Sequence, residues 1–415
     1  MQATYVIEPK VHRALYQNAV KKLLVENLED YSKFLTESGY SIMSDLVDSR
    51  LLDKAIDDSL ISIDKVNEFL INEINYGLQR NLYIYYLADT TLLEDELYVT
   101  KSINSLSRYY SNCDLVNGFP FVYKISMGTD HGKTELIYAD VTKEDSVIKN
   151  ISLVFSKGIT YDGAEVNYYI GVEINVELKT MIIKLRGKEG FDGPFKININ
   201  ELQNNFKINI INIFNLESIN TNLLIQKVIY NMTRDLTDKV LSPTMTVVNS
   251  KMASEVQQII TQWNKLIIDE EVELTTKDIN SIKESILNNY YRLHMQHVIG
   301  KIPNKTLVDK YEVDGYVRTV KFVDDTIGEG KAKSHTKKES LLDTSVYYDI
   351  KSRLDDSKVI KYTTIYWINM NDKYEPMGTS FHAESNGRFK CNVLPYYFDK
   401  EMFDYVLRKI VESKE

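Results

Sequence analysis

Hydrophobic residues in the first hundred positions recur every three or four residues, which is the period of a helix that buries one face. Val20, Leu24, Leu28 and Leu35 follow this spacing, and Gly39 is suited to end the helix. Further amphipathic stretches follow before residue 80. The pattern predicts a helical domain over residues 1–112, arranged as a bundle or cap.

Between residues 113 and 214 the period falls to two, as in a strand with one buried face. The clearest alternation runs from Val172 to Lys179, and Met181 to Leu185 follows as the expected return strand. Phe206 to Ile211 is expected to add a short strand. These patterns predict a central, mostly antiparallel β domain over residues 113–214.

The helical period returns between residues 215 and 325. An apolar stripe runs from Leu224 to Val240 and should end before Pro243, because proline removes a bond of the helical ladder. More helix follows, and Asp314-Gly315 predicts the turn of a hairpin. The order helix, helix, hairpin resembles that of a winged-helix DNA-binding module, so residues 215–325 are predicted as a winged-helix-like helical segment with a hairpin.

The segment from Gly328 to Lys338 carries lysines and no large apolar side chain, which predicts a basic loop at residues 326–340. Beyond it, alternation around Asn386-Gly387 predicts a second hairpin, and residues 399–411 a closing helix. Residues 341–415 are thus predicted as a C-terminal domain of mixed type. The whole chain is predicted to belong to the α+β class.

The composition excludes several classes of protein. The net charge of −9 argues against a protein that coats nucleic acid by bulk attraction, although it allows a local basic surface. The 2 cysteines predict neither a disulfide framework nor a thiolate zinc site, and favour a reducing cytoplasm. Charges near the N-terminus argue against a secretory signal, and no apolar run reaches the ~20 residues of a membrane span. We expect a soluble, cytoplasmic protein without membrane contact.

Charge is unevenly distributed along the chain. Residues 276–340 carry 12 Lys and Arg against 9 Asp and Glu, a surplus of +3 that leaves −12 for the remainder. A local cationic surface is what contact with phosphates requires, whereas a solvated lysine loop is the simpler interpretation. The predicted nucleic-acid contacts are Lys283, Arg292, Lys301, Lys305, Lys310, Arg318, Lys321, Lys331, Lys333, Lys337 and Lys338.

Two short patterns fit a nuclease that uses a divalent metal. One is Asp162 with Glu177 and Lys179, and the other is Asp343 with Asp349 and Lys351. In such a site two carboxylates hold Mg²⁺, and a lysine on the same strand face positions the attacking water. Any strand with charges on its solvated face produces the same pattern, so the alternative is two ordinary strand faces.

Three functional hypotheses follow. The favoured one is a non-catalytic accessory subunit that associates with DNA or RNA inside a larger complex with protein partner subunits, and the composition suits a mobile element. It needs no cofactor. The alternatives are a Mg²⁺-dependent nuclease and a structural or assembly protein without nucleic-acid contact. Because no complete catalytic signature is present, an enzymatic role is not favoured.

Overall fold

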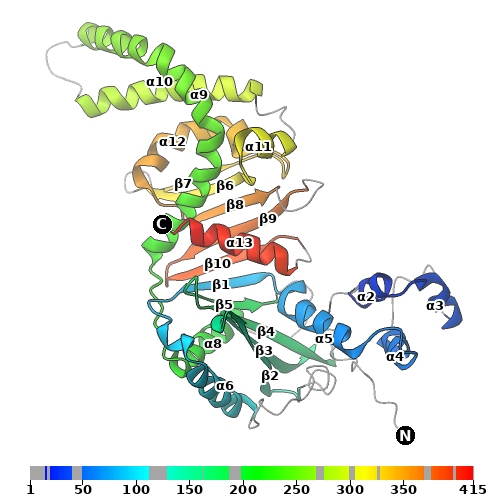
Figure 1. Ribbon diagram of the computed structural model, residues 1–415. Helices are drawn as coiled ribbons and strands as arrows, with labels where there is room; N and C mark the ends of the chain where they lie inside the picture. Colours follow the sequence, from blue (N-terminus) through cyan, green and yellow to red (C-terminus); the bar gives the residue numbers. More distant parts are fainter. Residues whose placement is uncertain are drawn as a thin grey trace. The chain divides into compact units, whose positions relative to one another are not determined.

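The computed structural model describes residues 15, 19–39, 49–111, 129–161, 163–186, 198–267, 275–298, 304–324, 328–368, 375–395 and 399–414. It confirms the α+β class, because helices pack against antiparallel strands (Figure 1). The chain divides into two compact units. Unit 1 comprises residues 1–220 and 396–404, and unit 2 comprises residues 221–395 and 405–415. The finer division into five parts stays a prediction.

Unit 1 contains an antiparallel sheet with the strand order β2-β3-β4-β5-β1. Its strands are β1 (Asn81–Tyr86), β2 (Thr134–Glu144), β3 (Val147–Tyr161), β4 (Ala164–Asn175) and β5 (Thr180–Leu185). Its helices are α2 (Ala19–Asn27), α3 (Tyr31–Glu37), α4 (Ser49–Asp57), α5 (Ile63–Asn72), α6 (Glu96–Ser111) and α8 (Ile199–Ile213), with a π-helical turn η1 (Glu73–Gly77) and a 3-10 turn η2 (Thr91–Glu94).

Both faces of the unit 1 sheet are covered. On one face, Phe206 of α8 stacks on Tyr110 of α6, and both rings contact Phe155 of β3. On the other face, Tyr76 of η1 lies over Lys184 of β5. Because neither face meets solvent, β5 is buried along its whole length.

A buried ion pair lies beneath η1. Lys184 Nζ is 2.7 Å from Glu173 Oε2, with the side chains 0% and 5% exposed. The ammonium also lies 4.0 Å from the centroid of the Tyr76 ring and 4.5 Å from that of Phe403. Burial lowers the pKa of Lys184, and the Glu173 carboxylate opposes that shift. The Tyr76 hydroxyl also donates to Glu173 Oε2 at 3.4 Å. The loss of hydration of the two charges is therefore offset by their mutual contact, this hydrogen bond and the aromatic rings.

Unit 2 contains five antiparallel strands in the order β10-β9-β8-β6-β7. They are β6 (Gly315–Asp324), β7 (Gly328–Lys333), β8 (Tyr362–Trp367), β9 (Met377–Glu384) and β10 (Arg388–Val393). The helices are α9 (Asn222–Ile267), α10 (Thr276–Val298), α11 (Asn304–Tyr311), α12 (Ser345–Ser357) and α13 (Lys400–Glu412), whose first turn is counted with unit 1, and η4 (Leu341–Asp343) is a 3-10 turn.

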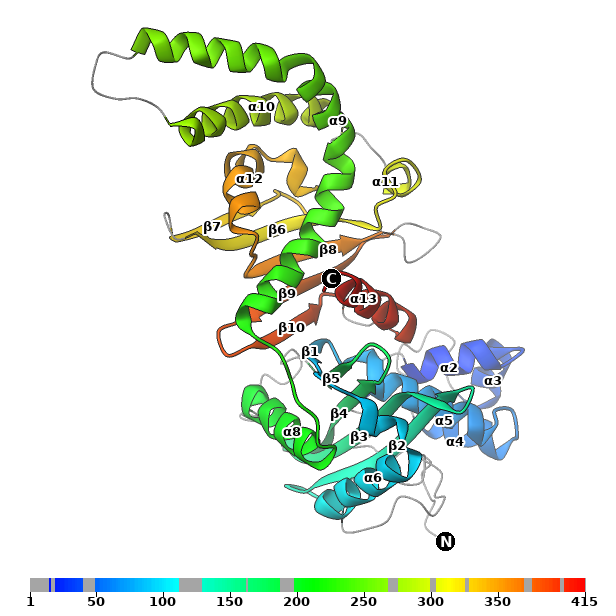
Figure 2. The same cartoon turned by 60° about the vertical axis from the view of Figure 1, so that its left-hand side comes forward.

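The longest helix, α9, extends over 46 residues. The Thr221 hydroxyl accepts a hydrogen bond from the Leu224 N–H at 3.1 Å and caps the start of the helix. The first half of α9 packs on the strands, and the second half pairs with α10 (Figures 1 and 2). We call residues 244–267 together with α10 the arm.

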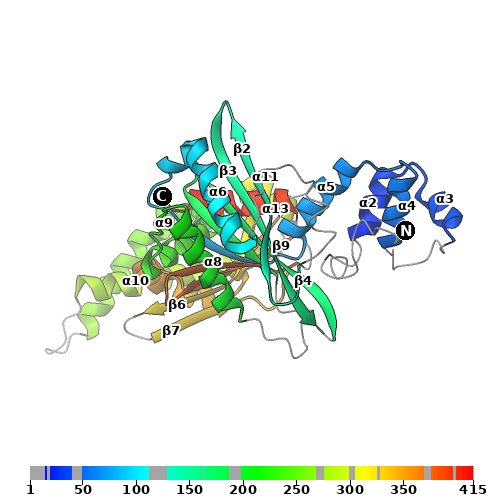
Figure 3. The same ribbon diagram turned by 90° about the horizontal axis from the view of Figure 1, so that it is seen from below.

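The helices of unit 2 pack on one face of its strands. The hydroxyls of Thr233 in α9 and Thr363 in β8 lie 3.3 Å apart, and the Trp367 ring of β8 meets Tyr405 of α13 at 5.9 Å. Figure 3 shows α9 on one side of β6 and β7. The side chains on this covered face are buried, and include Val317, Val320, Phe322, Ala332, Ile365, Trp367, Phe381, Phe389 and Cys391.

Three sequence predictions for unit 1 are wrong. Residues 81–86 of the expected helical domain form β1, inside the sheet. The expected strand from Phe206 to Ile211 is part of α8, because Phe206 and Ile210 are four residues apart and bury one helical face. The alternation from Val172 ends at Asn175, and the chain then turns, with Lys179 at φ 47°. The return strand β5 is confirmed.

In unit 2 three predictions are also wrong. Helix α9 continues through Pro243, since one lost hydrogen bond is tolerated in a helix packed on a sheet and on α10. The residues before Asp314-Gly315 form the helix α11, which ends at Tyr311, and not the first strand of a hairpin. β6 pairs with β8 instead, so the winged-helix order of elements is absent. Residues 328–333 of the expected basic loop form the strand β7. The β9–β10 hairpin and the closing helix are confirmed.

No helix in the part of the chain that the structure describes combines the length and the apolar character needed to cross a bilayer.

The buried pair of unit 1 gives a stability prediction. Lys184→Met leaves the Glu173 carboxylate buried without its cation, and should lower the free energy of unfolding by about 3–5 kcal/mol. Adding Glu173→Leu removes the stranded charge and should recover most of the loss. Urea unfolding of the wild type and both variants measures this. A double variant no more stable than Lys184→Met would contradict the assignment of the loss to an unpaired charge.

Candidate functional site

The second face of the unit 2 strands is the candidate site. The helix and ring contacts described above all involve the covered face, and alternate residues of each strand point the other way. We call this second face the open face. Its residues are polar, cationic or aromatic, in contrast to the apolar residues of the covered face.

Strand register places five residues in one line across the open face. In antiparallel strands directly opposite residues share a face. Lys331 of β7 is opposite Lys321 of β6, which is opposite Tyr362 of β8. Tyr362 is in turn opposite His382 of β9, and His382 is opposite Lys390 of β10. We call these residues the basic row: Lys331, Lys321, Tyr362, His382 and Lys390.

A second, mostly neutral row lies beside the basic row. It consists, by the same register, of Lys333, Thr319, Thr364, Ser380 and Asn392. The Tyr362 hydroxyl lies 2.7 Å from the Thr364 hydroxyl, so a hydrogen bond ties one row to the other. Thr319, Thr364 and Ser380 of this row are buried.

A stacked and buried aromatic pair lies on the same side of the strands, beyond the second row. The rings of Tyr316 and Tyr366 lie 5.6 Å apart and nearly parallel. The Tyr316 hydroxyl donates to the Lys337 carbonyl at 2.8 Å. This bond brings the segment after β7, with exposed Lys337 and Lys338, to the end of the open face.

Positive charge exceeds negative charge on the two rows. Lys321, Lys331, Lys333 and Lys390 are cationic. The acids Glu329 and Glu384 lie on the same face beside the rows, where Glu329 pairs with Lys321 and Glu384 with Arg388. The hydrogen bond from Lys321 holds the pKa of Glu329 below its ordinary value. Glu329 compensates the charge of Lys321, so Lys331, Lys333 and Lys390 supply the remaining positive charge of the two rows.

His382 adds a neutral ring to the basic row. Burial, with a smaller contribution from the Lys390 charge, lowers the pKa of His382 to about 4. Its Nε2 lies 3.2 Å from Asn392 Nδ2. Because an amide nitrogen only donates, Nε2 accepts and the proton of the neutral ring is on Nδ1. The His382 ring meets Tyr362 edge to face, with centroids 4.5 Å apart.

The predicted nucleic-acid contacts fall into three groups. Lys321, Lys331 and Lys333 lie on the open face, and Arg318, Lys337 and Lys338 lie near its end. Lys283 and Arg292 are on α10, and Lys305 and Lys310 are on α11, away from that face. Lys301 lies outside the described residues. The structure thus brings together six of the eleven predicted residues.

Neither nuclease pattern lies on a strand. Glu177 and Lys179 are in the turn after β4, where Glu177 pairs with Lys149 at 3.0 Å, and Asp162 lies outside the described residues. The strand placement is wrong because Asn175 ends β4 and accepts a hydrogen bond from the Leu178 N–H at 2.7 Å.

The second pattern lies on a helix. Asp349 and Lys351 belong to α12, where two positions along the chain face different directions, and Lys351 pairs with Asp355 one turn later. Burial raises the pKa of Asp343 to about 6. No group of three metal-binding side chains occurs among the described residues. The nuclease hypothesis therefore gains no geometric support.

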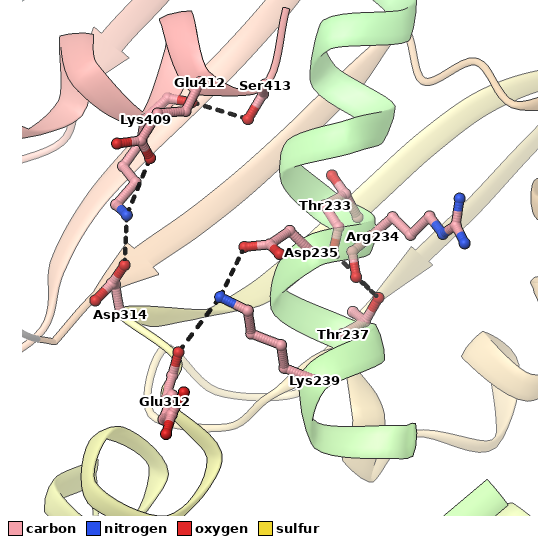
Figure 4. Close-up of polar contacts among 10 residues, drawn as sticks. All are labelled: Thr233, Arg234, Asp235, Thr237, Lys239, Glu312, Asp314, Lys409, Glu412 and Ser413. Carbon is pink, nitrogen blue, oxygen red and sulfur yellow. Dashed lines mark hydrogen bonds and ion pairs between the residues drawn. The ribbon is translucent and has the colours of Figure 1, made fainter. Parts of the chain in front are cut away.

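Unit 2 also has a pocket of about 500 Å³, lined by residues of α9 and α13 together with Asp314 and Trp367. Figure 4 shows its charged side chains. Lys409 pairs with Asp314 at 2.7 Å, and Lys239 pairs with Asp235 at 3.4 Å. Since these charges neutralise one another, the pocket offers no strong recognition of a charged ligand.

Comparison of the chain with protein-family models, curated proteins and solved structures finds no significant match. The geometry of the open face therefore carries the functional argument alone.

Three members of the basic row are absent from the predicted contacts: Tyr362, His382 and Lys390. The sequence indicates that β9 and β10 each have a polar face, because alternate residues of both strands are polar. What it lacked was the strand order, which alone places β8, β9 and β10 beside the lysines of β6 and β7.

The surroundings of His382 predict its titration. The NMR resonances of its imidazole should titrate with a midpoint near 4, and Lys390→Ala should raise that midpoint because a neighbouring positive charge is removed. The unfolded chain takes up the proton first, so His382 costs stability as the pH falls from about 6.5 towards 4. A midpoint near 6.5 in the wild type would show that the ring is solvated, contrary to the structure.

Proposed function

We propose that this protein binds nucleic acid through the open face of unit 2, as a non-catalytic subunit of a larger complex. The basic row supports this most directly, because it sets three lysines, a tyrosine and a neutral histidine in one line across five strands. Cations that contact phosphates, combined with rings that contact bases, are the usual elements of such a surface.

The charge balance of the chain supports the same proposal. With −9 overall, general attraction to a polyanion is weak, so binding must come from a local surface. Lys331 and Lys333 lie beside Lys321, which is paired with Glu329, and they add positive charge that a phosphate can contact.

The arm supports association with a protein partner. Ile259, Trp263 and Leu266 are exposed and lie at positions i, i+4 and i+7 of α9, along one helical stripe. Trp263 is 52% and Leu266 82% exposed. Tryptophan is enriched among the residues that dominate protein interfaces. The stripe is therefore the region where we place contact with another subunit of the complex.

The proposal predicts which lysines matter. Lys331→Ala with Lys333→Ala should weaken binding to a mixed-sequence oligonucleotide about 10-fold at low salt, because two phosphate contacts are lost. The dependence of log K on log salt should become shallower by roughly 1–2. Fluorescence anisotropy at several salt concentrations measures both quantities.

The matched control is Lys305→Ala with Lys310→Ala, which removes the same charge from α11. This control should retain wild-type affinity. If both double variants lose affinity equally, binding depends on the total charge of the protein and not on the open face, which would contradict the proposal. Binding to polyglutamate as tight as to the oligonucleotide would replace nucleic acid with an acidic protein as the ligand.

A further inference from the structure

The width of the open face limits which form of nucleic acid fits it. Neighbouring strands lie about 4.8 Å apart, so the five strands of the basic row span roughly 19 Å. The major groove of a duplex is about 12 Å wide and admits a helix or a two-stranded ribbon. A sheet of five strands is too wide to enter this groove and reach base edges inside it.

The hairpin β6–β7 does not act as a separate ribbon. β6 is paired with β8 over its whole first part, from Gly315 to Lys321, and α12 contacts both β6 and β7. Its lysines therefore belong to the surface of a sheet. Bases must come to this surface, which requires bases that are not stacked inside a duplex.

Tyr362 is suited to receive such a base. It lies in the middle of the basic row, between Lys321 and His382, and is half-buried. Its hydroxyl is held by Thr364 at 2.7 Å, and its ring meets His382 edge to face. The ring is therefore fixed before a ligand arrives, which lowers the entropic cost of stacking.

The surrounding groups complete a site for one strand. Lys321, Lys331 and Lys333 lie on the β6–β7 side of Tyr362, where they can follow the phosphates. Ser380 and Asn392 lie in the neighbouring row beyond Thr364, where Ser380 is buried and accepts a hydrogen bond from Asn392 Nδ2 at 3.3 Å, so the site offers a base stacking rather than hydrogen bonds. Stacking on an aromatic ring tolerates any base, so this arrangement implies little sequence preference.

We infer that the open face takes single-stranded DNA or RNA, with a base stacked on Tyr362 and the phosphates along the lysines of β6 and β7. This inference rests on the proposed function. It specifies that the nucleic acid is single-stranded, and it names Tyr362 as the residue that favours a single strand over a duplex.

The test compares a single strand of about 12 nucleotides with the duplex of the same sequence, using the full chain and fluorescence anisotropy. The single strand should bind at least about 5-fold more tightly. Tyr362→Leu should lose about 5-fold or more of that affinity. Tyr362→Phe keeps the ring and should bind nearly as the wild type does.

Each remaining outcome decides a separate point. Duplex binding as tight as single-strand binding overturns the inference and leaves the proposed function standing. Wild-type affinity in Tyr362→Leu overturns the stacking role, and absence of binding to every nucleic acid overturns both proposals. If Tyr362→Leu fails to fold, photocrosslinking of the wild type to a strand containing 5-iodouracil replaces it. A crosslink at Tyr362 supports the inference, and crosslinks confined to other residues overturn it.

Discussion

The register of the unit 2 strands is the constraint on which the open face depends. Side chains alternate between the two faces of a sheet, so a slip of one residue in β8 would turn Tyr362 towards α9 and Thr363 towards solvent. The hydrogen bond between Thr233 and Thr363 and the burial of Ile365 oppose such a slip. The apolar packing that stabilises the covered face thus also fixes the positions of the cations and rings on the opposite face.

A bulge in β6 sets the position of Lys321. The pairing with β8 shifts between Val317 and Thr319, so Arg318 is an extra residue. Without the bulge, strict alternation would place Lys321 on the same face as Val317, which is buried against the helices. With it, Lys321 lies on the open face, while Val317, Val320 and Phe322 all stay in the core. The bulge therefore reconciles a strand of mixed polarity with one buried face.

Sequence patterns predicted the elements better than their arrangement. The β9–β10 hairpin followed from Asn386-Gly387, and the α+β class followed from the two hydrophobic periods. The segment from Phe206 to Ile211, which is part of α8, also fits a strand pattern because it is rich in residues that favour strands. The path of α9 through Pro243 depends on packing against α10 and the sheet, which no local rule contains. The basic row depends on the order of five strands, which the sequence does not reveal. Sequence patterns therefore identify only its lysines in β6 and β7 as candidates.

The central claim is that nucleic acid lies on the open face, and footprinting of lysines tests it most directly. Acetylation of each lysine is measured by mass spectrometry with and without a saturating oligonucleotide. The account predicts that Lys321, Lys331, Lys333 and Lys390 become protected, while Lys305 and Lys310 of α11 react as before. Protection of the α11 lysines with unchanged reactivity on the open face would contradict it.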